Sequence, residues 1–302
     1  MNKLTTYLLT TIGLITLALP SMTSAENHHA SSLEFKSTPL TSNIFMLQGK
    51  GGNIGLVKGK QGLLLIDADY KEMAHALEAE LAKHGGINTV SYLINTHWHG
   101  DHTQGNETIG HHAQIIAHEN VRPRLLTSQE IKLFNMITEP YPEHALPSIT
   151  YKTSMSLHIN NKEINVVHFP NGHTDGDSIV FIKNDNIVHM GDHFFSGMFP
   201  FVDVAHGGNV LKMAKNIKSV LAMLDTKTKI IPGHGPLSTK ADLQAFHDML
   251  TGTSAEVNQM KEKGMTLEKI KEKGLSDKWT SWTKGFIPEK VWIDIVYSSL
   301  TS

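Results

Sequence analysis

The chain has no cysteine among its 302 residues. Without thiols it cannot form a disulfide framework or carry a lipid on an N-terminal cysteine. Thiolate metal ligands and a cysteine nucleophile are excluded for the same reason. Stability must therefore come from a hydrophobic core, and a chain of this length can build a sizeable one.

An excess of positive charge is also lacking, because 27 Lys and Arg stand against 29 Asp and Glu. The formal net charge of −2 offers no basic surplus for a nucleic acid, so we expect no nucleic-acid partner. The sequence shows no linker, low-complexity segment or close repeat. We therefore expect residues 26–302 to form a single domain.

The N-terminus carries an apolar run that is shorter than a membrane span. Lys3 precedes the run from Tyr7 to Leu19, which is followed by Pro20 and the small-residue stretch 21–25. This order is typical of a secretory signal peptide, with its charged start, apolar centre and cleavage site. We predict cleavage after Ala25, a periplasmic or secreted protein, and no membrane anchor.

The densest chemical signal is the stretch N-T-H-W-H-G-D-H at residues 95–102. Its ligating side chains are spaced H-x-H-x-D-H, at His97, His99, Asp101 and His102. Residues 89–94 are typical of a buried strand, so we expect the cluster on a loop, because positions two apart on a helix face different ways. Imidazole and carboxylate together suit zinc or a similar divalent metal. The alternative is a polar turn in a chain that has 19 histidines.

The motif resembles the signature of the metallo-β-lactamase superfamily of dinuclear hydrolases. That family adds a later His, then an acidic residue or Cys, and then a final His. Here His173 lies in N-G-H-T-D, Asp192 in M-G-D-H and His234 in P-G-H-G, in the same order. The resemblance extends from about Ile44 to the C-terminus, and these later residues disfavour the polar-turn alternative.

The resemblance implies two zinc ions per chain, held by seven side chains. One ion is expected on His97, His99 and His173, and the other on Asp101, His102 and His234, with Asp192 bridging. We also expect Asp101 and His102 to take part in catalysis. In this scheme a metal-bridging hydroxide attacks a carbonyl, because a metal lowers the pKa of bound water from about 15.7 towards ~7.

Local patterns predict a mixed α/β fold. Short apolar runs predict strands at 44–48, 54–57, 63–66, 89–94, 113–117, 156–159, 163–168, 178–182, 187–191 and 229–231. Periodicity predicts helices at 71–83, 118–126, 208–224 and most of 239–300. The family resemblance implies an αβ/βα four-layer sandwich. Residues 128–148 lack clean periodicity and are either a packed surface loop or a flap over the site.

Residues near the bridging position bear on the substrate. Many metallo-β-lactamases have Cys where this chain has Asp192, and a Lys three residues later that binds the substrate carboxylate. This chain has Phe195 at the later position. Lys212 and Lys215 either replace the cation or are solvated on a helix surface, which is the commoner role of such lysines. A bridging Asp is similar to glyoxalase II and lactonase-type relatives, although glyoxalase II acts on a glutathione thioester inside the cell.

We therefore expect an exported zinc-dependent hydrolase of a small-molecule ester, lactone, thioester or amide, with weak β-lactamase activity. The alternatives are an efficient class B β-lactamase and a non-enzymatic zinc-binding protein, and the complete ligand set favours the enzyme.

His193 and His206 are candidates for supporting a ligand or binding substrate. Met198, Phe199 and Phe201 either line an apolar substrate wall or belong to the core. The oligomeric state stays open.

Overall fold

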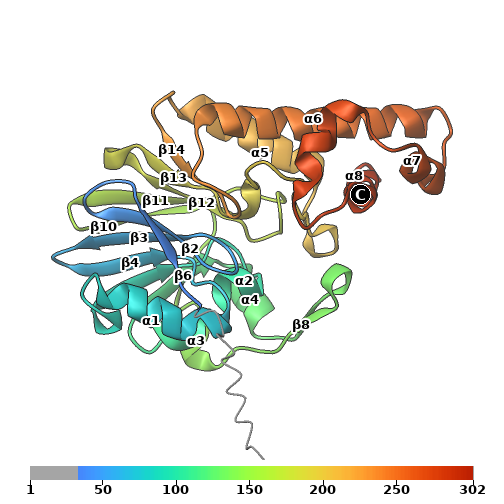
Figure 1. Ribbon diagram of the computed structural model, residues 1–302. Helices are drawn as coiled ribbons and strands as arrows, with labels where there is room; N and C mark the ends of the chain where they lie inside the picture. Colours follow the sequence, from blue (N-terminus) through green and yellow to red (C-terminus); the bar gives the residue numbers. More distant parts are fainter. Residues whose placement is uncertain (1–32, 302) are drawn as a thin grey trace, which may run out of the picture. The chain divides into compact units, whose positions relative to one another are not determined.

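A computed structural model describes residues 33–301, and the predicted signal peptide lies outside them. The described residues form two main β-sheets flanked by helices (Figure 1). One sheet has seven strands in the order β1-β2-β3-β4-β5-β6-β9, and the other has five in the order β10-β11-β12-β13-β14. The mixed α/β prediction is therefore confirmed.

The first sheet combines an antiparallel start with a parallel end. Its strands are β1 (Lys36–Pro39), β2 (Ile44–Gln48), β3 (Ile54–Gly59), β4 (Gly62–Ile66), β5 (Val90–Ile94), β6 (Gln114–His118) and β9 (Ile149–Tyr151). Strands β1 to β4 pair antiparallel, whereas β4, β5, β6 and β9 pair parallel. Parallel pairing requires a crossover between strands, and helix α1 (Ala74–Ala82) supplies the one between β4 and β5.

The second sheet repeats this scheme. Its strands are β10 (Ser154–Ile159), β11 (Lys162–His168), β12 (Ser178–Ile182), β13 (Ile187–His189) and β14 (Lys229–Ile231). The first four pair antiparallel, and β14 joins β13 in parallel after the crossover through helix α5 (Val210–Met223). Asn209 caps α5, because its side-chain oxygen accepts hydrogen bonds from the backbone N–H groups of Leu211 and Lys212.

The other α-helices and several short 3-10 turns connect or flank the strands. The α-helices are α2 (Gly100–Thr103), α3 (Asn106–Ile109), α4 (Val121–Leu125), α6 (Lys240–Glu262), α7 (Leu267–Lys273) and α8 (Glu289–Ser299). Short 3-10 turns are η1 (Lys71–Met73), η2 (Ile87–Thr89), η3 (Lys132–Phe134), η4 (Glu143–Ala145), η5 (Lys183–Asp185), η6 (Gly191–His193), η7 (Val204–His206) and η8 (Asp277–Lys284). Helices α1 and α3 lie on the first sheet, and α5 and α6 lie on the second (Figure 1).

Three apolar clusters separate these layers. The central one joins the inner faces of the two sheets, with Ile44, Ile66 and Ile94 facing Ile164 and Ile182. A second cluster packs the outer face of the first sheet against α1, and a third packs the second sheet against α5, α6 and α8. Helices, sheet, sheet and helices follow one another, so the predicted four-layer sandwich is confirmed.

The structure corrects several local predictions. The helix predicted over residues 118–126 is shortened to α4, and the strands β1 and β9 were not predicted. Residues 128–148 are not irregular throughout, because β7 (Gln129–Ile131) and β8 (Met136–Thr138) pair as a separate two-stranded hairpin. Such short strands give little periodic signal, and a turn at Asn135 with a φ of 50° joins them.

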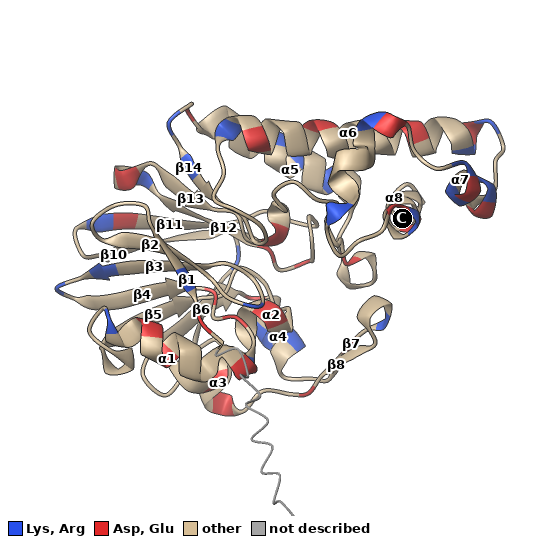
Figure 2. Cartoon of the chain, viewed as in Figure 1, with Lys and Arg blue, Asp and Glu red and all other residues tan. Residues whose placement is uncertain are grey.

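The surface of the described residues is mixed in charge. Acidic and basic residues are interspersed along α6 and α7 (Figure 2). Within residues 33–301, no helix is both long and apolar enough to cross a membrane.

Candidate metal centre

The seven predicted ligands converge where strands of the two sheets end. His97 and His99 follow β5, His173 lies between β11 and β12, and Asp192 and His234 follow β13 and β14. Side chains at the carboxyl ends of neighbouring strands meet at one edge, which is where ligands bind in open α/β sheets. The loop prediction is only partly right, because Asp101 and His102 lie on the single-turn helix α2.

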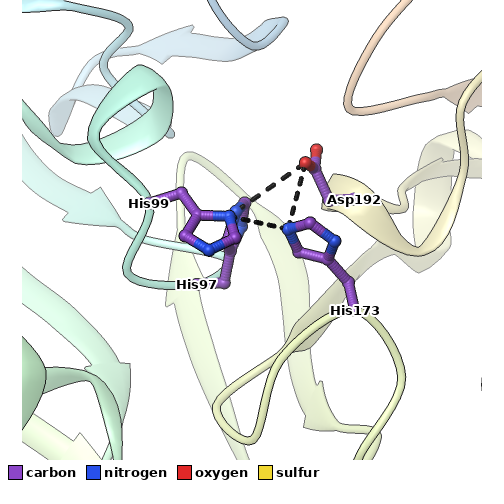
Figure 3. Close-up of side chains that lie close together, drawn as sticks. All are labelled: His97, His99, His173 and Asp192. Carbon is purple, nitrogen blue, oxygen red and sulfur yellow. Dashed lines mark hydrogen bonds and ion pairs between the residues drawn. The ribbon is translucent and has the colours of Figure 1, made fainter. Parts of the chain in front are cut away.

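These side chains form two adjoining groups that share Asp192. The first group contains His97, His99, His173 and Asp192, and the second contains Asp101, His102, Asp192 and His234. In each group, one ligand atom per residue lies within 4.8 Å of all the others. Figure 3 shows the first group, with three imidazole rings and the Asp192 carboxylate directed towards a common centre.

Hydrogen bonds to the outer ring nitrogens set the orientation of two imidazoles in the first group. His173 Nδ1 donates to the carbonyl oxygen of Phe201 at 2.8 Å, and His99 Nε2 donates to Asp203 Oδ2 at 3.0 Å. Each ring therefore keeps a lone pair on its other nitrogen. These two nitrogens, His173 Nε2 and His99 Nδ1, lie 2.8 Å apart and face the centre.

Asp67 sets the orientation of the other two imidazoles of the motif, those of His97 and His102. Its carboxylate accepts a hydrogen bond from His102 Nδ1 at 2.8 Å, and others from the backbone N–H and hydroxyl of Thr96 at 2.7 and 2.8 Å. Because the Thr96 hydroxyl proton goes to Asp67, its oxygen accepts from His97 Nδ1 at 3.1 Å. In the neutral form of each ring, the Nε2 atom keeps a lone pair that faces the centre.

The first group has the protonation state that metal ligands need. Burial and the nearby His102 lower the pKa of His97 well below its ordinary value. Burial also lowers the pKa of His173 to about 4, although the charge of Asp192 opposes it. Both rings are therefore neutral at pH 7, as imidazole must be to bind a metal.

The second group is rich in negative charge. Burial would lower the pKa of His102, but the carboxylates of Asp192, Asp101 and Asp67 outweigh this effect and raise it well above its ordinary value. The pKa of His234 rises to about 9 because Asp192 and Asp101 likewise outweigh the effect of burial. A divalent cation would balance this charge.

Three buried ligand atoms support a metal at this position. His97 Nε2, His102 Nε2 and Asp192 Oδ1 make no hydrogen bond among the described residues, although His102 Nε2 and Asp192 Oδ1 lie 3.0 Å apart. Polar atoms buried without a partner are costly, and a bound cation would satisfy all three. With five imidazoles and two carboxylates, the donor set fits a borderline divalent metal.

Two glycines allow the chain to approach the ligands closely. A Cβ atom at Gly233 would lie 2.0 Å from Asp192 Oδ1, and one at Gly52 would lie 2.1 Å from the ring of His102. Only glycine fits at these positions without displacing a ligand. The glycine that precedes His234 in the sequence therefore has a steric role.

A cavity of about 300 Å³ opens over the two groups. Its lining includes the candidate ligands His99, Asp101, Asp192 and His234, together with Lys50, Gly51, Tyr70, Gly100, Ile131, Phe134, Met136, Phe195, Phe201 and Phe286. The hairpin β7–β8 contributes Ile131, Phe134 and Met136. Residues 128–148 therefore include a flap over the site, which was one of the two predicted alternatives.

Aromatic rings cover the second group. Phe195 is fully buried and stacks on His234, with ring centroids 4.9 Å apart and an interplanar angle of 19°. Phe286 lies 5.8 Å from the ring of His234 and 6.0 Å from those of Phe195 and Phe134. The cavity wall next to His234 is therefore aromatic.

Other candidate residues take up definite positions. Phe201 lines the cavity, whereas Phe199 is buried in the core and stacks on Trp292. Lys212 and Lys215 lie on α5 and do not line the cavity, so they do not replace the missing cation. Both side chains are exposed on α5, which agrees with the alternative that they are solvated helix-surface lysines.

His206 and His193, the two histidines predicted to support a ligand or bind substrate, have different hydrogen-bond partners. His206 Nδ1 lies 2.8 Å from the Asp203 carboxylate that holds His99, so His206 supports a ligand indirectly. His193 is buried beneath the site, with Nε2 3.2 Å from the side-chain nitrogen of Asn216. It does not line the cavity, so a substrate contact is excluded.

Sequence reasoning missed Asp67, Asp203 and Tyr70. Asp67 had a usable signal, because it is the first polar residue after the apolar run of β4, beside the strand that carries the motif. Asp203 follows an apolar stretch and Tyr70 precedes a helix, and neither position suggests a contact with the site. Tertiary structure alone brings them there.

The family model of the metallo-beta-lactamase superfamily matches residues 47–234. The chain belongs to the metallo-beta-lactamase superfamily. The prediction of a metal-dependent hydrolase of this superfamily is thereby confirmed. The family and the two groups of His and Asp side chains together indicate binding of divalent metal.

Sequence relatives are distant. An uncharacterised protein of Aquifex aeolicus is 27% identical over 158 residues, which cover 51% of this chain and 72% of that protein. A probable metallo-hydrolase of Methanocaldococcus jannaschii is 27% identical over 206 residues, covering 65% of this chain and 95% of the relative. An uncharacterised protein of Mycobacterium tuberculosis is 36% identical, but over only 42% of its own length.

Solved structures share the fold of the superfamily. A metallo-beta-lactamase from Pontibacter korlensis aligns with a TM-score of 0.59 at 18% identity, over 72% of this chain and 99% of that structure. The DIM-1 metallo-beta-lactamase aligns with a TM-score of 0.58 at 19% identity, over 73% and 98% of the two chains. At this level of identity the likeness concerns the fold.

Replacement of Asp203 by Asn is expected to weaken metal binding and turnover by about 10- to 100-fold. The variant keeps the side-chain shape but loses the charge that accepts hydrogen bonds from His99 and His206. Competition with a chelator measures the metal affinity. Asp248→Asn on the exposed face of α6 is the matched control, and equal affinities in the two variants would contradict a positioning role for Asp203.

Proposed function

We propose that this protein is an exported two-zinc hydrolase that cleaves uncharged small-molecule esters or lactones, and that it hydrolyses β-lactams weakly. The observation that carries the proposal is the cavity lining. Aromatic and aliphatic side chains surround the metal centre, and Phe195 stacks on the ligand His234 where many relatives have a substrate-binding Lys.

The ligand set supports the two-metal part of the proposal. His97, His99 and His173 would hold one zinc, Asp101, His102 and His234 the other, and Asp192 would lie between them. Zinc supplies a strong nucleophile from water at neutral pH and polarises a carbonyl group. Such a site needs no Ser or Cys nucleophile, in keeping with a chain that lacks cysteine.

Other residues of the chain orient the candidate ligands and line the space for the substrate. Asp203 and Asp67 hold the imidazoles of His99 and His102 in the tautomers that leave inward lone pairs. Tyr70 lines the cavity, and burial together with the charge of Asp101 raises the pKa of its hydroxyl, which therefore stays protonated and can donate a hydrogen bond. Phe195 and Phe286 limit access of water to the His234 side.

The charge of the cavity rim favours an uncharged substrate. Lys50 is the only Lys or Arg among the described residues that line the cavity. Its ammonium group is exposed and forms an ion pair with Glu72, so it presents little net positive charge to a substrate. A substrate carboxylate therefore finds no buried cation to bind.

We expect measurable but poor β-lactam hydrolysis, limited by a high KM. Loss of one charge-assisted contact costs roughly 1.5–3 kcal/mol, or about one to two decades of kcat/KM. Steady-state kinetics of the zinc-loaded protein on a chromogenic β-lactam and on an uncharged lactone or ester measure the difference. The ester or lactone should have the higher kcat/KM.

Efficient β-lactam turnover with a low KM would contradict this substrate assignment. Lys50→Ala would then show whether Lys50 supplies the cation, because an increase in KM confined to the β-lactam identifies the contact. Absence of turnover on every ester, lactone and β-lactam by protein that binds zinc would favour the non-enzymatic alternative.

A further inference from the structure

A second cavity, of about 510 Å³, lies next to the catalytic one. It is bounded by the hairpin β7–β8, by the segment 201–206 and by helix α8. Its lining consists of Ser128, Gln129, Glu130, Ile131, Lys132, Leu133, Phe201, Val202, Asp203, Val204, Ala205, His206, Val291, Asp294, Ile295 and Ser298. No residue in this list is one of the seven candidate ligands.

Two side chains separate the cavities. Ile131 and Phe201 line both of them, so the two cavities adjoin at these side chains. The ring of Phe201 lies 5.7 Å from that of His99 and 5.8 Å from that of His173. Phe201 therefore borders the second cavity and also lies next to two of the candidate ligands.

The inner surface of the second cavity is apolar. Phe201, Val202 and Ile295 are buried there, and Val291 is half-buried. Glu130 and Lys132 are exposed, and Asp294 lies 2.9 Å from Lys271 Nζ. The carboxylate of Asp203 is buried, but it already accepts hydrogen bonds from His99 and His206. Such a lining accommodates an apolar chain and has no buried free charge for a polar ligand.

The hairpin that forms one wall is separate from both main sheets. Its two strands pair only with each other, and in Figure 1 it extends from the first sheet towards the C-terminal helix α8. Leu133 and Ile137 on it are 43% and 66% exposed. A two-stranded hairpin is weakly stable by itself, so it can yield to a chain that passes beneath it.

We propose that the second cavity binds an unbranched apolar chain of the substrate, which runs from the reacting carbonyl past Ile131 and Phe201 towards Val291. The inference rests on the proposed ester or lactone hydrolysis and adds a substrate class, namely esters or lactones with a long acyl or alkyl chain. Each methylene buried beyond the wall contributes about fourfold to kcat/KM.

Two series of uncharged esters test the chain-length preference. One is lengthened from two to twelve carbons on the acyl side, and the other on the alkoxy side, with the zinc-loaded full chain as enzyme. In at least one series kcat/KM should increase by about fourfold per methylene over several carbons and then level off. Flat profiles in both series would overturn the proposal.

Val291→Trp provides the structural test, because it fills the second cavity from α8 without touching the catalytic one. The ratio of kcat/KM for the longest and shortest esters should fall by at least about tenfold. The matched control is Leu211→Trp, at an exposed apolar residue on α5 that lines neither cavity, and it should keep the wild-type ratio. Equal ratios in both variants would place the chain elsewhere.

Binding of 1-octanol gives a readout that does not depend on turnover. Calorimetry of zinc-loaded protein should detect binding that Val291→Trp weakens and Leu211→Trp leaves unchanged. If short esters are hydrolysed but octanol does not bind and the profiles are flat, the second cavity is not a substrate site and the proposed function stands. If no ester is hydrolysed, the proposed function fails, and octanol binding alone then decides whether the cavity takes an apolar chain.

Discussion

Removal of zinc with a chelator is expected to reduce hydrolysis by at least about 10⁴-fold, because in the proposed mechanism the metal is the group that activates water. Activity should return only after two equivalents of zinc per chain are restored. The reason is geometric: seven ligands in two groups exceed what one tetrahedral ion uses. Metal analysis combined with kinetics during the titration measures both quantities.

Magnesium is the control in this titration. It prefers an all-oxygen environment, and five of the seven ligands here are imidazoles, so magnesium should not restore activity. Zinc should also raise the melting temperature, since a ligand present at about 1,000 times its Kd stabilises the folded state by ~4 kcal/mol. Full activity with one equivalent of zinc would contradict the two-metal proposal.

Asp192→Asn is expected to lower kcat/KM on the order of 10³-fold, equivalent to about 4 kcal/mol of lost transition-state stabilisation. The carboxylate is buried and belongs to both ligand groups, and neighbouring charges from His102 and His234 outweigh burial and keep its pKa well below the ordinary range. Asparagine keeps the shape but removes the charge that both metals would share. Zinc stoichiometry should fall together with the rate.

Circular dichroism of the apoprotein separates loss of function from loss of fold in this variant. Asp248→Asn, an exposed carboxylate on α6, is the control for the loss of one negative charge and should behave like wild type. Wild-type zinc content and rate in Asp192→Asn would show that Asp192 is not a ligand. Asp192→Cys restores an anionic ligand of the type found in many β-lactamases, so we expect folded protein with altered zinc affinity.

The two experiments test different parts of the centre. The zinc titration determines how many ions the catalytic state holds, and Asp192→Asn tests whether one carboxylate connects the two groups. A loss of only the second equivalent in Asp192→Asn would place Asp192 mainly with Asp101, His102 and His234. A loss of both equivalents would indicate that the bridge also holds the three-histidine group together.

The sequence by itself determined much of the secondary structure and the composition of the ligand set. Strands such as β5 and β14 are continuous apolar runs, and α5 has a regular apolar stripe, so local pattern was enough to predict them. His97, His99, Asp101 and His102 lie within six positions. Their spacing and order could be read directly, and the structure brings them together with the three later residues.

Only the tertiary structure decided which groups hold and surround those ligands. Asp203 is 104 positions from His99, and Asp67 is 35 positions from His102, and no local pattern links either pair. The aromatic wall depends in the same way on Phe286 folding back over His234. These contacts join segments that are distant in the sequence, so they depend on the tertiary structure and not on a local pattern.

The hairpin β7–β8 shows that the space available to a substrate could not be predicted from the sequence either. Its three-residue strands are too short for a periodic signal, so the sequence left residues 128–148 as either loop or flap. The structure places Ile131 between two cavities, with Val291 on the far wall of the second. Metal chemistry depends on residue types that a sequence displays, whereas the space open to a substrate depends on how distant segments pack.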